Sequence, residues 1–155
     1  MKETTLCYIE NDGCYLMMHR TKKKNDENSG KWIGIGGKLE KDETPRECAK
    51  REIYEETGLS VSGLCYRGKV VFKSDIYEDE LMHLFTANCE SRDVRVCDEG
   101  ELAWINKADV MFLNLWEGDK VFLKRLIEDE RDFFHIVLCY EGDNLKYIKE
   151  ESNES

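Results

Sequence analysis

The chain has 155 residues, which we expect to form one domain over residues 1–150 around a single hydrophobic core. It carries 23 basic and 33 acidic residues, for a formal net charge of −10. Nucleic acid polymers and membrane surfaces are anionic, so this charge argues against either of them as a partner. A small anionic ligand is compatible with the chain where a metal ion neutralises its charge.

The cysteines indicate a reducing environment. Seven are present, an odd number, and no Cys-x-x-Cys pair occurs. Several lie inside apolar runs, which predicts free and mostly buried thiols in a cytoplasmic protein. Residues 1–10 carry no signal-peptide pattern, and no apolar run approaches the length that crosses a membrane. These patterns are compatible with a monomer and with a homodimer.

The chain begins with a predicted β-hairpin. Apolar runs at residues 4–9 and 14–19 flank Asn11-Asp12-Gly13, a turn sequence typical of hairpins. Arg20 follows the second run directly. At the end of a core strand a basic side chain either reaches a substrate phosphate or remains a surface charge.

A polar stretch and a glycine-rich stretch follow the hairpin. Residues 22–30 are rich in Lys, Asn, Asp and Ser and predict a mobile loop, and residues 32–35 predict a short strand. Gly34, Gly36 and Gly37 allow the next loop to approach a neighbouring element closely. Its backbone carbonyls are therefore available to a metal ion.

The clearest helix signal covers residues 45–57. Thr44 and Glu47 form a capping-box pattern, and Pro45 suits the first helical position. Gly58 is a typical C-terminal stop.

One face of this helix gathers like charges. At about 100° per residue, Glu52, Glu55 and Glu56 share one arc. Like charges three or four residues apart cost roughly a few tenths of a kcal/mol per pair, and Arg51 offsets only part of this. The arc is either a solvated acidic face or a set of hard oxygen ligands for Mg²⁺ or Mn²⁺.

The second half of the chain alternates strands and helices. The predicted elements are strands at residues 64–72, 81–89 and 102–105, an acidic loop at 93–100, a brief helix at 106–110, a long helix from about 116, and a hairpin of 134–140 with 145–148. Residues from 150 onward should fray, with 151–155 as a tail. The pattern predicts an α/β (α+β) fold in which a mixed β-sheet is sandwiched between α-helices.

The long second helix carries an acidic residue on its apolar side. Trp116, Phe122 and Leu126 share one stripe, and Asp119 falls inside it near the N-terminus. A carboxylate that faces an interior is costly unless it is paired or used. Asp119 therefore either stabilises the helix N-terminus or accepts a hydrogen bond from a purine edge beneath the Trp116 ring.

The stretch around the first helix resembles the Nudix box, and every defining position matches. The matching positions are Gly37, five residues, Glu43, seven residues, Arg51-Glu52-Ile53, one residue, Glu55-Glu56, one residue, and Gly58-Leu59. The resemblance implies a Nudix fold and Mg²⁺-dependent hydrolysis of a nucleoside diphosphate linked to another group, with Mn²⁺ as an alternative cofactor.

The resemblance also assigns roles inside the box. The implied metal ligands are the box glutamates and one loop carbonyl: Glu52, Glu55, Glu56, and Gly36 or Gly37. Arg51, with Glu43, would hold the loop and the helix in register. Glu52, Glu56 or Glu99 would take the proton of the attacking water, and the sequence does not choose among them. Glu99 lies in an acidic loop, where carboxylates are usually only solvated.

Within the Nudix group the chain looks like the MutT-type enzymes that hydrolyse oxidised purine nucleoside triphosphates such as 8-oxo-dGTP. The segments that carry this likeness are Gly-Lys-Trp before the box, Gly-Lys-Val-Val-Phe, Glu80-Leu81-Met82 and Trp116-Glu117-Gly118-Asp119. The implied base pocket consists of Thr5, Ile33, Phe72, Met82, Trp116 and Asp119, with Arg20 and Lys38 near the phosphates. Animal members have a base-reading asparagine at the position of Ile33 and an acidic residue at that of Gly118, so this chain lacks two polar readers.

The implied reaction converts a nucleoside triphosphate into a nucleoside monophosphate and pyrophosphate. One alternative is another nucleotide conjugate. ADP-ribose hydrolases of this family carry a proline downstream of the box, whereas the one proline here, Pro45, lies inside it. Dinucleoside polyphosphate hydrolases carry a downstream tyrosine, and Tyr77 keeps that class open. A non-catalytic nucleotide sensor would have lost box carboxylates, and none is lost.

Overall fold

One mixed sheet organises the chain. The computed structural model describes residues 1–22 and 26–151, so residues 23–25 of the predicted mobile loop and residues 152–155 of the predicted tail lie outside it. Within the described residues, nine strands form a single sheet: β1 (Lys2–Asn11), β2 (Cys14–His19), β3 (Trp32–Ile33), β4 (Ile35–Lys38), β5 (Ser62–Ser74), β6 (Glu80–Asn88), β7 (Glu101–Asn106), β8 (Phe134–Glu141) and β9 (Asn144–Glu151). The helices are α1 (Pro45–Thr57), α2 (Lys107–Val110) and α3 (Glu117–Ile127).

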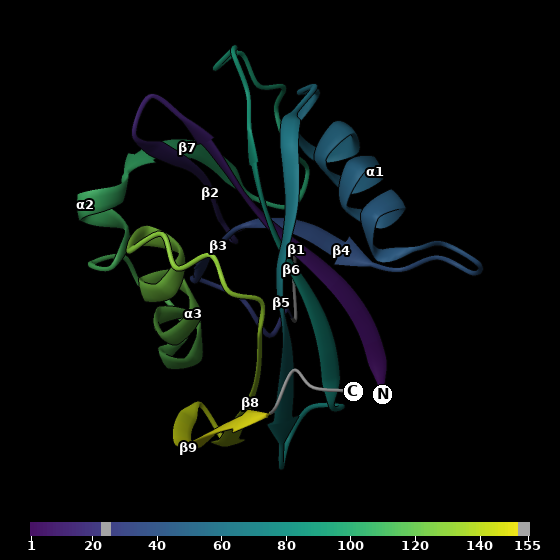
Figure 1. Ribbon diagram of the computed structural model, residues 1–155, viewed down its shortest axis with the longest axis vertical. Coiled ribbons are helices and arrows are strands. Elements are labelled where there is room, and N and C mark those ends of the chain that lie inside the picture. The colour runs from purple at the N-terminus through teal and green to yellow at the C-terminus, as the bar shows by residue number, and fades with distance from the viewer. Residues whose placement is uncertain (23–25, 152–155) are drawn as a thin grey trace.

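The helices cover both faces of this sheet, as the sequence predicted. Strand order is β3-β2-β1-β6-β5-β8-β9, with β4 beside β1 and β7 beside β2. The pairs β1–β6 and β5–β8 are parallel and the others are antiparallel. Figure 1 shows α1 on one side of the sheet and α2 with α3 on the other.

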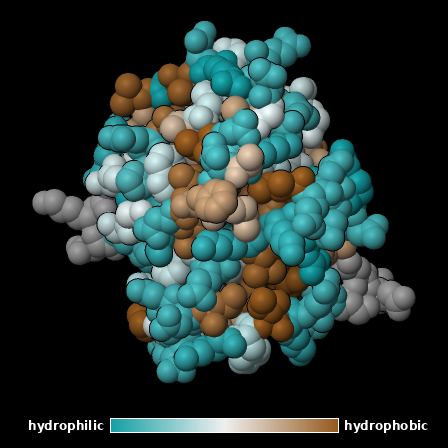
Figure 2. All heavy atoms as spheres, turned by 90° about the vertical axis from the view of Figure 1, so that its left-hand side faces the viewer, coloured by the Kyte–Doolittle hydropathy of each residue, from teal (hydrophilic) through white to brown (hydrophobic). Residues whose placement is uncertain are grey.

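Each helical layer has its own hydrophobic core. Ala49 and Ile53 of α1 pack with residues of β1, β2 and β6, including Phe85. Phe122 and Leu126 of α3 pack with a second buried cluster on the opposite face. The outward side of α2 and α3 is largely hydrophilic, with apolar side chains in a band through its middle (Figure 2). The amphipathic pattern of both helices thus accounts for the three layers.

The local signals of the box helix are confirmed. The Glu47 backbone N–H donates to Thr44 Oγ1 at 3.1 Å, and the Thr44 N–H donates to Glu47 Oε1 at 3.0 Å. Pro45 is the first helical residue, and the helix ends at Gly58 in the left-handed conformation. Both ends of α1 are therefore fixed by the residues that flank the acidic face.

The predicted strand at residues 32–35 is instead two strands. The β1–β2 hairpin pairs only near its turn, through Glu10↔Tyr15 and Asn11↔Cys14. Beyond that point the hairpin opens, β3 pairs with β2, and β4 pairs with β1. This chain switch at Gly34 was not visible in the apolar pattern, because both strands are short. It also places Gly36 and Gly37, which were predicted to lie in a loop, within β4 next to α1.

The C-terminal strands extend further than predicted. β9 continues to Glu151, so Glu150 and Glu151 pair with Ile136 and His135 rather than fray. All seven cysteines are free, and five of them are buried, as the sequence predicted. Across residues 1–22 and 26–151, no helix has the length and apolar character that a membrane span requires.

Candidate active site

Arg51 lies at the centre of the polar face of α1. Its Nε and Nη2 donate to the two carboxylate oxygens of Glu43, at 2.7 and 2.9 Å. Its Nη1 lies 2.9 Å from Glu52 Oε1 and 3.2 Å from Glu55 Oε2, and Nη2 donates to the Lys38 carbonyl at 3.2 Å. This hydrogen bonding holds the pKa of Glu43 at about 2. Arg51 thus joins α1 to Glu43 and to the end of β4, which are the segments it was predicted to hold in register.

Strand β4 lies directly against Glu52. A Cβ atom at Gly37 would stand 2.5 Å from Glu52 Oε1, so this position has no room for a side chain. The Gly37 carbonyl accepts a weak hydrogen bond from Cys48 Sγ at 3.7 Å. Burial raises the pKa of Glu52, although Arg51 opposes the shift. The Glu52 carboxylate is thereby confined between β4 and α1.

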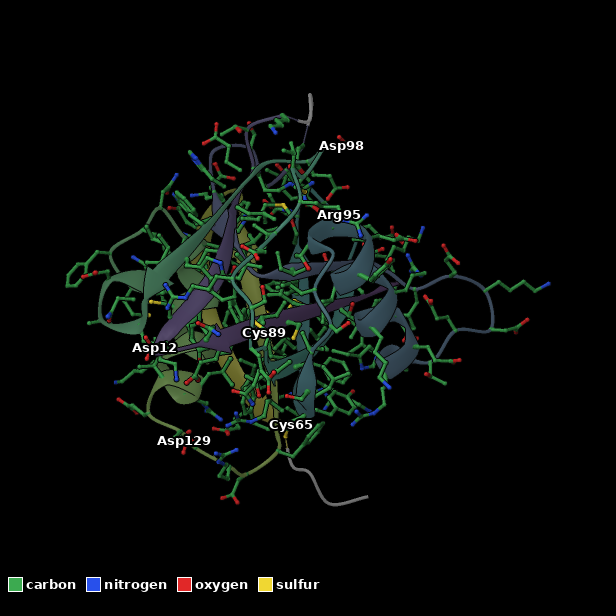
Figure 3. All side chains as sticks on the ribbon, turned by 90° about the horizontal axis from the view of Figure 1, so that it is seen from above. Asp12, Cys65, Cys89, Arg95, Asp98 and Asp129 are labelled. Carbon is green, nitrogen blue, oxygen red and sulfur yellow. The ribbon has the colours of Figure 1, made fainter. Side chains whose placement is uncertain are left out.

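The acidic loop at residues 93–100 places Glu99 beside the glutamates of α1. The Arg95 backbone N–H bonds to the Thr57 carbonyl at 3.0 Å, so the loop lies over the C-terminal end of α1 (Figure 3). Glu99 Oε2 accepts from Arg20 Nη1 at 3.2 Å. Burial, followed by the adjacent Glu99 carboxylate, raises the pKa of Glu56 to about 9. A loop residue that is usually only solvated is here a neighbour of a box glutamate.

The carboxylates fit a hard divalent cation in chemistry, but they do not surround one position. Among the described residues, no group of three or more His, Cys, Asp or Glu side chains is arranged as a ready metal site. Glu55 is mostly exposed and, like Glu52, turns to Arg51. Glu56 Oε2, however, is buried and has no hydrogen-bond partner in the described structure. An unpaired buried oxygen beside further carboxylates is the donor set that Mg²⁺ prefers.

A cavity of about 310 Å³ opens beside this cluster. It is lined by Gly36 and Gly37 at the end nearest α1 and extends between the sheet and α3. The structure brings together at its walls all eight predicted substrate residues: Thr5, Arg20, Ile33, Lys38, Phe72, Met82, Trp116 and Asp119. Its volume lies at the small end of the range for ligand pockets.

Trp116 forms one wall of the cavity. Its Nε1 donates to Asn28 Oδ1 at 2.8 Å, and Tyr140 meets the indole edge-on at 5.5 Å between ring centroids. Arg20 binds Asp26 at 2.8 Å and so joins this part of the predicted mobile loop to the end of β2. The described part of the loop is therefore a wall of the cavity.

The far end of the cavity holds buried carboxyl groups. Asp119 is 4% exposed, and burial, followed by Glu80, raises its pKa to about 8. Burial also raises the pKa of Glu80. A Cβ atom at Gly118 would stand 2.5 Å from the Tyr140 hydroxyl, to which the Gly118 N–H donates at 2.6 Å. The Tyr140 hydroxyl thus leaves no room for a side chain at position 118, next to Asp119.

Several lining residues were missed by the sequence analysis. The structure adds Lys2, Thr4, Glu27 and Glu80. Thr5 borders the cavity, but its hydroxyl faces Cys48 of α1 at 3.3 Å, whereas the hydroxyl of Thr4 faces Glu80. Strand alternation was the available signal, since Glu80 lies two residues before Met82 and shares its face.

Comparisons with known proteins agree with this geometry. The family model of the NUDIX domain matches residues 2–126. The oxidized purine nucleoside triphosphate hydrolase of Danio rerio is 33% identical over 111 residues, which cover 70% of this chain and 70% of that protein. The mouse (Mus musculus) protein of the same name is 30% identical over 131 residues and 83% of each chain. A crystal structure of a MutT protein from Bacillus halodurans matches with a TM-score of 0.85 at 24% identity, over 97% of this chain and 98% of that one. On these grounds, we assign the chain to the Nudix family of hydrolases.

Proposed function

We propose that this Nudix hydrolase cleaves purine nucleoside triphosphates, including oxidised ones such as 8-oxo-dGTP, to nucleoside monophosphate and pyrophosphate in a Mg²⁺-dependent reaction. The observation that carries the proposal is that Gly37 borders both parts of the site. It lies directly against Glu52, and it also lines the aromatic cavity, which holds buried carboxyl groups. The free cysteines support a reducing, cytoplasmic location for this activity.

The two ends divide the substrate between them. Trp116 and Phe72 offer aromatic faces for a base, and stacking of this kind tolerates different purines. Arg20 and Lys38 line the cavity near the glycine loop, where cationic side chains stabilise phosphate oxygens. A triphosphate that extends from the base toward α1 would therefore place its phosphates beside the glutamates.

The glutamates perform the acid–base work in this proposal. A water molecule attacks a phosphorus of the triphosphate chain, the bond to the leaving phosphate oxygen breaks, and one proton is released. Glu52, Glu56 or Glu99 accepts that proton. These carboxylates would hold Mg²⁺, or Mn²⁺ as a substitute, and the bound ion would neutralise charge and lower the pKa of the attacking water. Arg51 keeps Glu52 and the glycine loop in register.

A second candidate substrate class is a dinucleoside polyphosphate. Tyr77 lines the cavity and is 38% exposed, so its ring is available to a second base at the mouth. The cavity volume of about 310 Å³ favours a single nucleoside inside. We therefore place the triphosphate first and the dinucleotide second.

The decisive experiment incubates the protein with dGTP, 8-oxo-dGTP, dATP, ADP-ribose and a dinucleoside tetraphosphate, with Mg²⁺ and after complete chelation. Chromatographic separation of the nucleotide products follows all five substrates, because only the triphosphates release pyrophosphate. We expect the fastest turnover with a purine triphosphate and loss of that turnover on chelation. Equal rates in chelator would remove the metal from the mechanism. Faster turnover of the tetraphosphate or of ADP-ribose would move the substrate class to nucleotide conjugates.

A further inference from the structure

One carboxylate without a role so far, that of Glu80, stands on the sheet side of the cavity. Glu80 begins β6, where it is paired with Lys2 of β1 on one side and with Phe72 of β5 on the other. All three residues line the cavity, as does Met82, two positions further along β6. Glu80 therefore lies among the side chains that would surround a base, not at the phosphate end.

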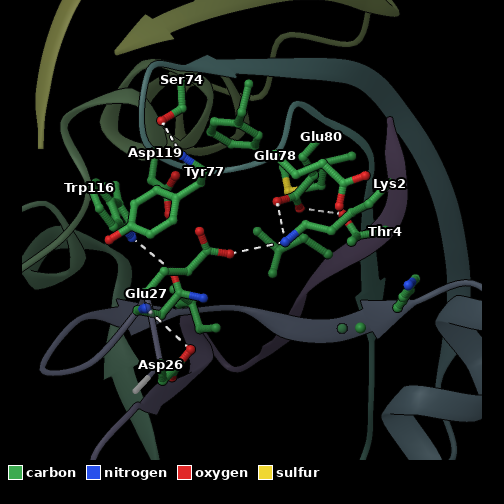
Figure 4. A pocket seen from close by; sticks show the side chains of 18 of the residues that line it. Lys2, Thr4, Asp26, Glu27, Ser74, Tyr77, Glu78, Glu80, Trp116 and Asp119 are labelled. Atoms are coloured by element: carbon green, nitrogen blue, oxygen red, sulfur yellow. Dashed lines mark hydrogen bonds and ion pairs between the residues drawn. The ribbon is translucent and has the colours of Figure 1, made fainter. Parts of the chain in front are cut away.

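Two neighbours fix the position of the Glu80 side chain. Thr4 Oγ1 donates to Glu80 Oε2 at 2.5 Å, and Lys2 Nζ lies 3.6 Å from Glu80 Oε1. Lys2 also reaches Glu27 at 3.1 Å, across the mouth of the cavity (Figure 4). The Glu80 side chain is only 20% exposed. These contacts hold one defined rotamer and stabilise its charged form against burial.

Asp119 provides an independent sign that this end of the cavity takes a ligand. It is 4% exposed and lines the cavity, yet its carboxyl group makes no hydrogen bond or ion pair among the described residues. Buried carboxyl groups are normally paired, because an unpaired one costs several kcal/mol (roughly 2–7). A hydrogen-bonding group of the ligand is the missing partner that the cavity can admit.

The chemistry of these two groups defines what they can bind. A carboxylate only accepts hydrogen bonds, so Glu80 requires a donor on the ligand. A guanine-type base presents a ring N–H and an adjacent exocyclic amino group on one edge, whereas a hypoxanthine base lacks the amino group. We propose that Glu80 is a specificity-determining residue that accepts a hydrogen bond from the exocyclic amino group of a guanine-type base, while Asp119 binds the same edge. The proposal rests on the proposed function, whose substrate class it narrows.

Thr4 is a positioning residue in this arrangement. It does not accept or donate to the base, but its hydroxyl fixes Oε2 of Glu80, while Lys2 lies near the other oxygen, Oε1. Replacing Thr4 with valine keeps the branched shape and removes the hydrogen bond. Selectivity should then decrease less than when Glu80 itself is changed.

The test compares two substrates that differ only by that amino group. We would measure kcat/KM for dGTP and dITP with wild-type protein, Glu80→Gln, Thr4→Val and the control Glu90→Gln, which removes an exposed carboxylate elsewhere. We expect wild type and the control to prefer dGTP by on the order of 10- to 100-fold, Glu80→Gln to lose most of this preference, and Thr4→Val to fall between them. Misfolding would lower kcat/KM equally for both substrates and leave the ratio of the two values unchanged. Melting temperatures would report misfolding directly.

Nucleotide binding separates failure of this inference from failure of the proposed function. The same variants would be titrated calorimetrically with GMP and IMP, which requires no turnover. Glu80-dependent preference for GMP in a protein without triphosphatase activity would support the inference and overturn the proposed function. An unchanged dGTP-to-dITP ratio and an unchanged GMP-to-IMP ratio in Glu80→Gln would overturn the inference, whatever the activity.

Discussion

The two ends of the site differ in how the chain builds them. The glutamate end comes almost entirely from residues 37–58, which comprise the end of β4, one loop and α1. The base end collects side chains from β1, β5, β6, α3 and the loop before β3. The glutamate end is a local motif, so the spacing of its residues along the sequence determines how they are arranged in space. The base end exists only after distant strands have paired. The glutamate end should therefore tolerate changes elsewhere, whereas the base end depends on register across the whole sheet.

The largest expected effect lies at the glutamate end. Glu52→Gln keeps the size of the side chain and removes its charge beside Gly37, where no other group can replace it. We expect kcat for triphosphate hydrolysis to fall on the order of 10²- to 10⁴-fold. Nucleotide affinity should stay within about threefold of wild type, because the base end is untouched.

Stopped-assay pyrophosphate release and calorimetric nucleotide binding would be measured on the same preparation. Glu128→Gln, on the far side of the molecule at the end of α3, is the control and should retain wild-type kcat. Full turnover by Glu52→Gln with normal binding would exclude this glutamate from the chemistry.

The next largest effect is expected at the base end, where the stability of the protein should depend on pH. Because burial raises the pKa of Asp119 from 3.8 to about 8, the folded protein holds a proton there that the unfolded chain has released. This contribution to stability therefore decreases as pH rises from about 4 to about 8, by at most about 1.4 kcal/mol per pH unit. Asp119→Asn cannot ionise, so its stability relative to wild type should rise over that interval and level off above it.

Urea unfolding at pH 5, 6, 7 and 8 in the presence of chelator measures this difference. The exposed Asp143→Asn is the control, and its difference from wild type should not change with pH. Parallel stability curves for Asp119→Asn and wild type would mean that Asp119 is ionised and paired in solution, contrary to the cavity described above.

How far the sequence predicts each end follows from this contrast. Thr44, Glu47 and Gly58 act on neighbouring residues, so the limits of α1 and the direction of its acidic face could be read directly from the chain. The position of Glu99 beside Glu56 depended on likeness to a family, because nothing near Glu99 in sequence fixes where its loop lies.

The missed residues are those that need strand register. Glu80 was left outside the predicted strand at residues 81–89, and Thr4 was passed over in favour of Thr5, since the face that each residue occupies depends on which strand lies beside it. The split into β3 and β4 was missed for the same reason, because its cause is the opening of the β1–β2 hairpin. A pattern confined to residues 32–35 contains no information about that opening.

Arg51 tests the link between the loop and the helix at the glutamate end. Arg51→Lys keeps the charge but cannot contact both Glu43 oxygens and the Lys38 carbonyl with one planar group. We expect the Mg²⁺ concentration for half-maximal activity to rise roughly 10- to 100-fold, as for other groups that orient metal ligands. Mg²⁺ titration of pyrophosphate release measures it, with Arg46→Lys at the start of α1 as the control. An unchanged Mg²⁺ requirement would show that the glutamates hold their geometry without Arg51.

The smallest expected effect concerns the core behind the base end. Tyr8 is fully buried against Tyr15 and Phe122, and its hydroxyl has no hydrogen-bond partner among the described residues. Tyr8→Phe removes that unpaired group without changing the ring, so we expect the free energy of unfolding to rise by about 1 kcal/mol. The exposed Tyr54→Phe should change it little. Destabilisation by Tyr8→Phe would instead show that the hydroxyl donates a hydrogen bond in solution. The nearby Asp119 would be the first acceptor to examine. The base end would then be held by a core contact that the glutamate end lacks.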